Sequence, residues 1–264
     1  MSWDRTIANK DKKPKAGGEI NPGSFAAQYE EHLAAQSRGK QFMQKKTFAP
    51  STIGYRHGNC PRYWTIAFTG AEFNNQSDAM AIANMSNGTY SHERIQDVFD
   101  DMGILESDEL EIVHEDPPIR GFIDAIIKWG ELSPFPLEIK TAKQEIFDAI
   151  KASGKPIDYH AMQLLMYMKV LNSDEGLLFY ENRNTNAILV MPIYMNERIS
   201  VYGDYLFDWM RQVKAAYDNG KMVAVPWKNG LKNKNCLYCP LKEACPTFGG
   251  DDDIHVPPLK VMVV

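Results

Sequence analysis

The chain has 264 residues, a formal net charge of −5, 44% hydrophobic residues and 24% charged residues. A globular chain of this length can bury a sizeable core, and these proportions exclude a largely disordered protein. The acidic sum excludes a uniformly basic coat for nucleic acid, although lysines and arginines gather locally. Neither an apolar run of about eighteen residues nor the apolar centre of a signal peptide occurs, so we expect a cytoplasmic protein with no membrane contact.

The first part of the chain predicts an arm and two helical regions. Residues 1–20 are rich in lysine, glycine and aspartate and predict a flexible arm. A helix is expected to begin with Ser24 as its cap, because apolar residues follow at helical spacing, namely Phe25, Tyr29 and Leu33. Residues 75–101 predict a second helical region that Gly88 interrupts.

From residue 110 onward, short β-like segments alternate with turns and then with helices. The expected strands cover 110–114, 119–129, 136–141, 176–180 and 187–192. The expected helices cover 143–151, 158–171 and 197–217. This order predicts an α/β fold with a central mixed sheet flanked by helices. We expect a single domain over 21–247, followed by a tail over 248–264.

Two of the expected strands carry charged residues that suit a metal site. Asp124 lies in an apolar segment, where a charge is costly unless it is paired or binds a metal. Residues two apart in a strand point the same way, so Glu138 and Lys140 share one face. Carboxylates of this kind suit Mg²⁺ or Mn²⁺, which activate water and neutralise charge on a phosphate. Taken alone, an Asp or Glu in a strand is more often a surface residue on the solvent face, and Glu-x-Lys by itself carries almost no signal.

Three further polar residues stand on the expected helices. His92 lies in the helix before the strands, and imidazole is a good ligand for Mn²⁺ or a related ion. Gln163 and Tyr167 are four residues apart on one helix, so both face one direction. Both can hydrogen-bond a phosphate or an attacking water. Each of the three alone is equally compatible with an ordinary helix-surface or core residue.

Four motifs in chain order carry a resemblance to a known family: Gly88…His92, Gly121-Phe122-Ile123-Asp124, Glu138-Ile139-Lys140 and Gln163-x-x-x-Tyr167. Their order, residue types and spacings resemble the RecB-type nucleases of the PD-(D/E)XK superfamily. The resemblance covers about residues 51–247 and implies a restriction-endonuclease-like core. It also implies a metal-dependent exonuclease that cleaves phosphodiester bonds at single-stranded DNA ends or overhangs, in recombination, repair or CRISPR spacer processing.

The same resemblance implies roles for the site residues. Divalent ions, Mg²⁺ or Mn²⁺, would be held by His92, Asp124, Glu138 and the backbone carbonyl of Ile139. Lys140 would position or help to deprotonate the attacking water. The helix residues Gln163 and Tyr167 would orient active-site groups and the DNA backbone.

The chain has one early cysteine and three late cysteines in a C-x2-C-x5-C pattern, namely Cys60, Cys236, Cys239 and Cys245. In a cytoplasmic protein they indicate a bound metal rather than disulfides, and spacing rules favour a structural zinc ion. The early cysteine, followed by Pro-Arg and an aromatic residue, resembles the iron–sulfur members of the RecB-type group. These include the CRISPR-associated exonucleases of the fourth Cas family and the AddB nuclease domain. This resemblance implies a [4Fe–4S] cluster joining Cys60 to the region 221–247, with Zn²⁺ as the alternative.

A basic cluster near the late cysteines predicts contacts with DNA phosphates, by Arg62, Lys228, Lys232 and Lys234. Nearby aromatic residues could stack on bases or pack around the metal, and both interpretations stay open for Tyr63, Trp64, Trp227 and Tyr238. The implied partners are single-stranded DNA ends and proteins of a recombination or CRISPR adaptation complex. Two other functions stay open, a DNA-end-binding subunit with little or no nuclease activity and a zinc-stabilised domain unrelated to nucleic acid.

Overall fold

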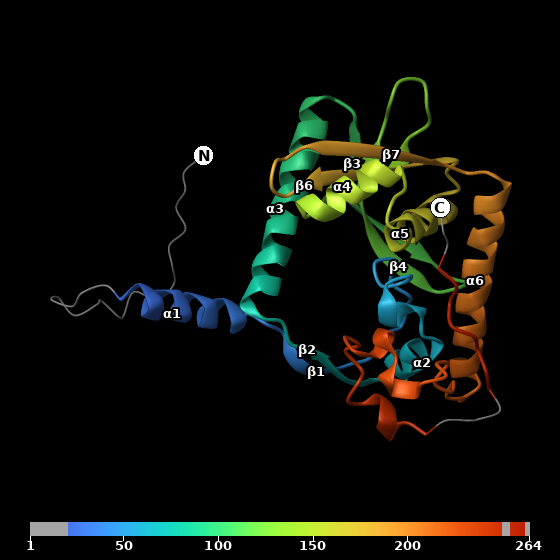
Figure 1. The fold of residues 1–264 in the computed structure, drawn as a ribbon. Coiled ribbons are helices and arrows are strands. Elements are labelled where there is room, and N and C mark those ends of the chain that lie inside the picture. Colours follow the sequence, from blue (N-terminus) through green and yellow to red (C-terminus); the bar gives the residue numbers. More distant parts are fainter. Residues whose placement is uncertain (1–20, 250–253, 262–264) are drawn as a thin grey trace.

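A computed structural model describes residues 21–249 and 254–261, and its centre is a five-stranded mixed sheet with helices on both faces (Figure 1). The predicted α/β class with a central mixed sheet is therefore confirmed. The expected arm over 1–20 lies outside the described residues, as do parts of the expected tail. Within the described residues, no helix is both long enough and apolar enough to cross a membrane.

The strands of the sheet follow one another in chain order, β3 to β7. Neighbouring strands are antiparallel except β5 and β6, which are parallel and are joined through two helices. A parallel pair needs such a crossover, because a tight turn cannot connect strands that run the same way. The elements are β3 (Leu105–His114), β4 (Ile119–Ile127), β5 (Phe135–Ala142), α4 (Gln144–Ser153), α5 (Asp158–Leu171), β6 (Glu175–Asn182) and β7 (Ile188–Tyr194).

Helices cover the two faces of this sheet in different ways. On β6, Leu178 and Tyr180 belong to the core cluster that includes α5, whereas Phe179 belongs to the cluster that includes helix α3 (Ala79–Asp101). This alternation follows from the two-residue period of a strand. The sheet therefore lies between α3 and α5, and residues near the end of β5 are flanked by both helices.

Two expectations about the helices are wrong. Helix α3 runs without interruption through Gly88, where an added Cβ would meet nothing within 4 Å. A glycine in an exposed helical position costs only about 1 kcal/mol, which the rest of a 23-residue helix outweighs. Helix α1 (Pro22–Ala34) begins one turn earlier than expected, because Asn21 is the cap and accepts a hydrogen bond from the Ser24 backbone N–H at 3.0 Å.

A second layer of the molecule lies below the sheet, and its elements were not predicted (Figure 1). It contains the two-stranded sheet of β1 (Gly39–Met43) and β2 (Ala71–Asn75) and the helix α2 (Pro61–Thr69). Helix α6 (Glu197–Asp218) connects β7 to this layer and packs against α2. The chain end returns here, since the Leu259 N–H donates a hydrogen bond to the Asn59 carbonyl at 2.9 Å.

Candidate active site

Glu138 and Lys140 lie side by side in the middle of β5, as the strand period predicts. The Lys140 ammonium donates a hydrogen bond to Oε1 of Glu138. The Glu138 side chain is 1% exposed, and its Oε2 has no hydrogen-bond partner among the described residues. Burial raises the pKa of the Glu138 carboxyl to about 8; the Lys140 charge opposes this rise and the Asp124 charge adds to it. A buried oxygen without a partner fits a position beside a bound cation.

Lys140 is held in its charged form by the same carboxylates. Burial alone lowers the pKa of its ammonium group, but the charges of Glu138 and Asp124 together outweigh burial and raise it. The side chain is still 22% exposed and lines a pocket beside the site. A fixed cation at this position can neutralise charge that develops on a phosphate.

Asp124 on β4 is fixed from two sides. Its Oδ2 accepts a hydrogen bond from the Ile139 backbone N–H at 2.7 Å, which orients the carboxylate toward β5. Its Oδ1 lies 3.4 Å from Nδ1 of His92 on α3. Only 13% of the Asp124 side chain is exposed. The structure therefore brings Asp124, Ile139 and His92 together, as expected from the motifs.

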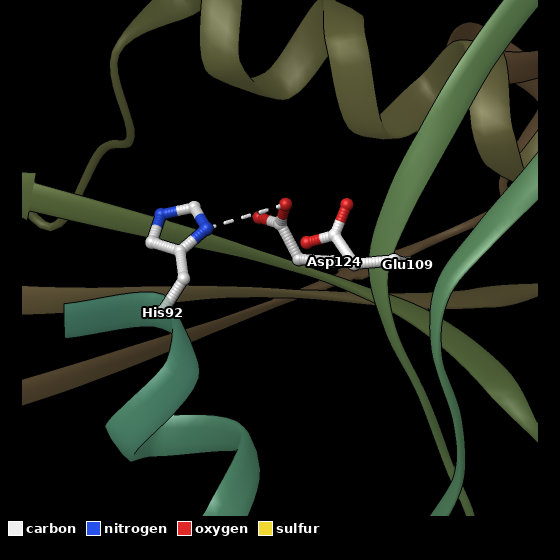
Figure 2. Close-up of side chains that lie close together, drawn as sticks. All are labelled: His92, Glu109 and Asp124. Carbon is white, nitrogen blue, oxygen red and sulfur yellow. Dashed lines mark ion pairs between the residues drawn. The ribbon is translucent and has the colours of Figure 1, made fainter. Parts of the chain in front are cut away.

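Glu109 completes this group, and it was not predicted from the sequence. It shares with His92 and Asp124 a set of ligand atoms that all lie within 4.8 Å of one another (Figure 2). Its neighbours in β3 pair with residues 125 and 123 of β4, so Glu109 lies across from Asp124. One imidazole and two carboxylates converging in this way have the donor chemistry that Mn²⁺ and Mg²⁺ prefer.

The backbone at Glu109 explains why sequence periodicity missed it. Its φ angle is +43°, in the left-handed region that non-glycine residues rarely adopt. Such strain is found most often at functional positions. The expected strand began at residue 110, whereas β3 begins at Leu105. The only signal in the sequence is the acidic segment directly before Leu110.

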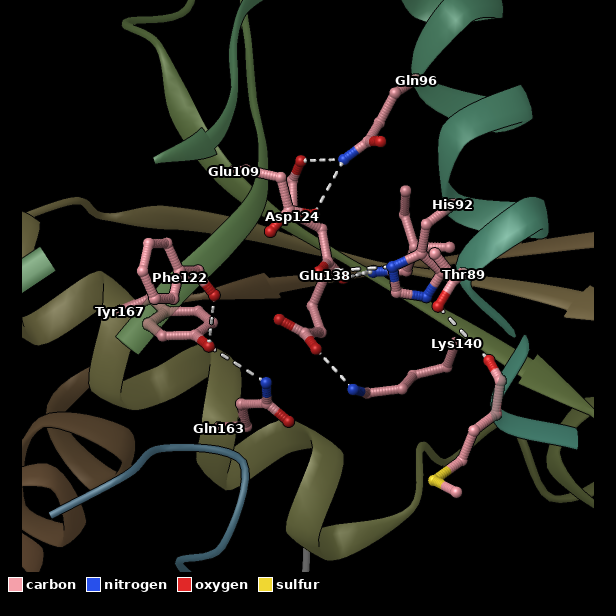
Figure 3. A network of polar contacts seen from close by, with 12 residues as sticks. Thr89, His92, Gln96, Glu109, Phe122, Asp124, Glu138, Lys140, Gln163 and Tyr167 are labelled. Carbon is pink, nitrogen blue, oxygen red and sulfur yellow. Dashed lines mark hydrogen bonds and ion pairs between the residues drawn. The ribbon is translucent and has the colours of Figure 1, made fainter. Parts of the chain in front are cut away.

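Gln96 on α3, one helical turn after His92, connects the two carboxylate-bearing strands. Its Nε2 donates to the Asp124 backbone carbonyl at 2.6 Å and to Oε1 of Glu109 at 3.4 Å (Figure 3). The residue is 7% exposed. It was also missed from the sequence, because a single glutamine on a helix carries no pattern. Its contacts position Asp124 and Glu109 relative to His92.

Gln163 and Tyr167 face one direction on α5, as predicted, and contact each other and β4. Gln163 Nε2 donates to the Tyr167 hydroxyl at 3.0 Å, and that hydroxyl donates to the Phe122 carbonyl at 2.8 Å (Figure 3). Both are buried, at 6% and 1% exposure, and burial raises the pKa of Tyr167 far above its usual range. They therefore support the backbone two residues before Asp124. Their expected contact with DNA stays a prediction.

The four cysteines come together in the second layer, although Cys60 is distant in sequence. All four are free and line one cavity beside Arg62 and Tyr63. Burial raises the pKa of the Cys60 thiol to about 12, and the neighbouring thiols add to the rise; Cys239 behaves similarly. Buried and partly buried thiols that line one cavity are suited to a bound metal, which would hold them as thiolates.

The residues predicted to contact DNA fall into two groups. Arg62 is 5% exposed, and its guanidinium donates to the Val223 carbonyl at 2.8 Å and to Sγ and the carbonyl of Cys245 at 3.3 and 3.1 Å. Its hydrogen bonds therefore hold the C-terminal segment against α2 and leave it no access to DNA. The predicted lysines are exposed beside the cysteines, namely Lys228, Lys232 and Lys234. Among the aromatic residues, Tyr63 and Trp64 are buried and pack, whereas Tyr238 is 70% exposed.

Several solved structures are similar to this chain, each at low sequence identity. No curated protein matches the chain. Among solved structures, that of SSO0001 is 19% identical with a TM-score of 0.45, covering 85% of this chain and 96% of that chain. The alkaline exonuclease LHK-Exo from Laribacter hongkongensis is 12% identical with a TM-score of 0.44, covering 72% and 95%. LHK-Exo in complex with dAMP is 15% identical with a TM-score of 0.42, covering 52% and 71%.

The family comparison is more direct, because it rests on the sequence of this chain. The family model of the PD-(D/E)XK nuclease superfamily matches residues 67–246. These residues contain α3, the whole central sheet and the three late cysteines. The matched segment is more than half of the chain, and it includes each residue of the carboxylate site. The chain therefore belongs to the PD-(D/E)XK nuclease superfamily.

Proposed function

We propose that this nuclease is a DNA exonuclease that uses Mg²⁺ or Mn²⁺ to cleave phosphodiester bonds at single-stranded ends or overhangs. The observation that carries the proposal is the convergence of His92, Glu109 and Asp124 beside the buried pair Glu138 and Lys140. The proposal starts from the nuclease superfamily to which the chain belongs. The preference for ends and for single strands rests on the motif resemblance.

The proposed ligand set comprises His92, Glu109, Asp124, Glu138 and the backbone carbonyl of Ile139. A divalent ion held there would supply a Lewis acid and would lower the pKa of a water molecule. Lys140 would orient an attacking water and neutralise charge on the phosphate oxygens. Gln163 and Tyr167 keep β4 in place, so that the Asp124 carboxylate keeps its direction during the reaction.

For the cysteine cavity we propose a [4Fe–4S] cluster with a structural role. All four cysteines line one cavity, which suits a metal held by four thiolates. The preference for a [4Fe–4S] cluster over a single zinc ion rests on the motif resemblance. Iron and zinc analysis and visible absorption of anaerobically purified protein test the assignment.

The decisive experiment assays the anaerobically purified protein with Mg²⁺ or Mn²⁺ on end-labelled linear and on circular single strands. We expect degradation of linear strands and resistance of circles, and loss of activity in Asp124→Ala. Cutting of circles at a similar rate rejects a need for ends. DNA binding by an inactive wild-type protein supports instead a DNA-end-binding subunit. Duplex DNA with and without overhangs tests the strand preference in the same assay.

The cellular setting of this activity is also a proposal. The motif resemblance favours recombination, repair or CRISPR spacer processing in the cytoplasm, with partner proteins of such a complex. Loss of DNA end processing in cells that carry Asp124→Ala, with normal protein abundance, is the expected outcome. An unchanged cellular output in that variant contradicts a catalytic role.

A further inference from the structure

A second polar pocket, of about 400 Å³, opens beside the catalytic residues. Its inner wall is formed by His92, Ile139 and Lys140, so it is continuous with the proposed metal site. Its outer wall includes Lys143 and Arg183. Among the described residues that line it, none is acidic. All the carboxylates of the candidate active site therefore lie outside this pocket, and its charged walls are cationic.

Arg183 is held in place before any ligand binds. Its Nε donates to Oγ1 of Thr141 at 3.0 Å, and its Nη1 donates to Oδ1 of Asn84 at 3.0 Å. Its backbone N–H also donates to the Ala142 carbonyl at 2.8 Å. These contacts connect the end of β5 to α3 through one guanidinium. They use only part of its five N–H donors, so donors remain for an anion.

Neither outer cation is neutralised by a neighbouring side chain. The ion pairs of residues 21–249 and 254–261 include no carboxylate partner for Lys143 or Arg183. Both residues are exposed at the pocket. Lys143 directly precedes the first turn of α4, where the positive end of the helix adds to the field and Glu145 offsets part of it. An anchored arginine and a lysine without acidic partners are the donors that bind phosphate oxygens.

We propose that Lys143 and Arg183 form a phosphate subsite, which binds the backbone phosphate next to the one that is cleaved. The inference rests on the proposed nuclease function and names two substrate-positioning residues for it. A volume of about 400 Å³ suits one nucleotide unit between the subsite and Lys140. The ligand class is thus a strand with at least two consecutive phosphodiesters, rather than an isolated phosphodiester.

The test compares two probes that differ in this respect. A short single-stranded oligonucleotide offers neighbouring phosphates, whereas bis(p-nitrophenyl) phosphate offers one diester alone. We expect Arg183→Gln and Lys143→Gln each to raise the KM for the oligonucleotide roughly tenfold with little change in kcat. Hydrolysis of bis(p-nitrophenyl) phosphate is expected to stay at the wild-type rate. Matched controls are Arg211→Gln on α6 and Lys151→Gln at the far end of α4.

Salt dependence gives a readout that a purely structural role does not change. Each variant is expected to lower the slope of log binding constant against log salt by about 0.7, the loss of one contact to a single strand. Equal loss on both probes overturns the proposal, because the residues then act on the catalytic site itself. An unchanged oligonucleotide KM overturns it as well.

Failure of the subsite and failure of the nuclease function are distinguishable. A wild-type protein that hydrolyses neither probe contradicts the nuclease function. In that case oligonucleotide binding, measured by fluorescence anisotropy with Ca²⁺, still tests the subsite. Weaker binding with a lower salt slope in Arg183→Gln and Lys143→Gln, but not in the controls, supports it; equal binding overturns it.

Discussion

The carboxylate site and the cysteine cavity differ in how the chain assembles them. His92, Glu109, Asp124 and Lys140 come from α3 and three consecutive strands of one sheet. The cavity instead joins Cys60 to a segment that begins at Cys236, which is 236 − 60 = 176 positions later. The cavity therefore depends on how distant segments pack together, whereas the carboxylate site depends on neighbouring strands.

The two sites are therefore expected to differ in role, the carboxylate site in catalysis and the cysteine cavity in stability. Backbone hydrogen bonds and Gln96 fix the carboxylate site, so its geometry does not depend on an ion. The cysteine cavity is closed by Arg62, by the apolar packing of Val223, Leu241 and Leu259, and by backbone contacts of the C-terminal segment. A metal at the cysteines would therefore contribute to folding, whereas an ion at the carboxylates would contribute to catalysis.

The largest expected effect is on turnover, in the carboxylate site. Lys140→Ala should lower kcat on single-stranded DNA on the order of 10³-fold, because it removes the fixed cation beside the phosphate. Mn²⁺ affinity should stay near the wild-type value, since Lys140 is no ligand in the proposed set. Activity assays and Mn²⁺ titration by electron paramagnetic resonance measure the two quantities. Lys155→Ala is the control, and substantial residual cleavage by Lys140→Ala contradicts the assigned role.

The next effect concerns stability and the cysteine cavity. Cys60→Ser should lower the melting temperature by roughly 10 °C, corresponding to about 3 kcal/mol for a chain of this size. The reason is that Cys60 is the one proposed ligand from the early part of the chain, and it would connect that part to the late cysteines. Thermal unfolding followed by circular dichroism measures it. In metal-free protein the same substitution should have little effect, and an equal decrease there shows that packing rather than metal is responsible.

A smaller effect is expected on the pH dependence of stability, because each of the two regions contains a buried histidine. Burial, reinforced by the Lys140 charge, lowers the pKa of His160 beside the carboxylate site to about 3. Burial likewise lowers the pKa of His57 beside the cysteines to about 4, with added repulsion from Lys45 and Arg56. The unfolded chain takes up these protons below about pH 6.5, whereas the folded chain does not. Stability is therefore fully present above pH 6.5 and is lost as the pH falls toward these values.

His160→Asn should remove the contribution of the first histidine alone. Between pH 7 and pH 5 the free energy of unfolding should fall by about 2 kcal/mol less in this variant than in the wild type. Asparagine keeps a polar atom near the Tyr180 hydroxyl, which His160 Nδ1 contacts at 3.0 Å. Urea unfolding at the two pH values measures the difference. An identical pH dependence in both proteins contradicts the assignment to His160.

The sequence predicts the parts of the fold that have a regular pattern. The strands β4, β5 and β6 and the helix α5 alternate or repeat in register, and the paired positions of Glu138 and Lys140 follow from the strand period. Helix α2 shows no such pattern, because eight of its nine residues are buried on all sides. The residues around α2 come from α6 and the C-terminal segment, and local sequence patterns do not predict such distant contacts.

Within the site, what could not be predicted depends on backbone geometry and tertiary contact. Asp124 and His92 are recognisable from motif order, but their separation of 3.4 Å results from how α3 packs on the sheet. Glu109 itself has a left-handed backbone conformation. This interrupts the regular alternation of side chains from which strand residues are assigned to a face. Arg62 is a basic residue that patterns assign to DNA, whereas the return of the C-terminal segment buries it.

The smallest expected effect tests Glu109, a proposed ligand that the sequence did not predict. Glu109→Gln should weaken Mn²⁺ binding about tenfold, because one carboxylate of the group is lost while His92 and Asp124 remain. Glutamine can still accept the hydrogen bond from Gln96, so the strands should keep their positions. At saturating Mn²⁺ the variant should recover much of its activity, and the visible absorption of the cysteine site should not change. Glu106→Gln on the same strand is the matched control, and an unchanged Mn²⁺ affinity in Glu109→Gln would mean that the ion is held without this residue.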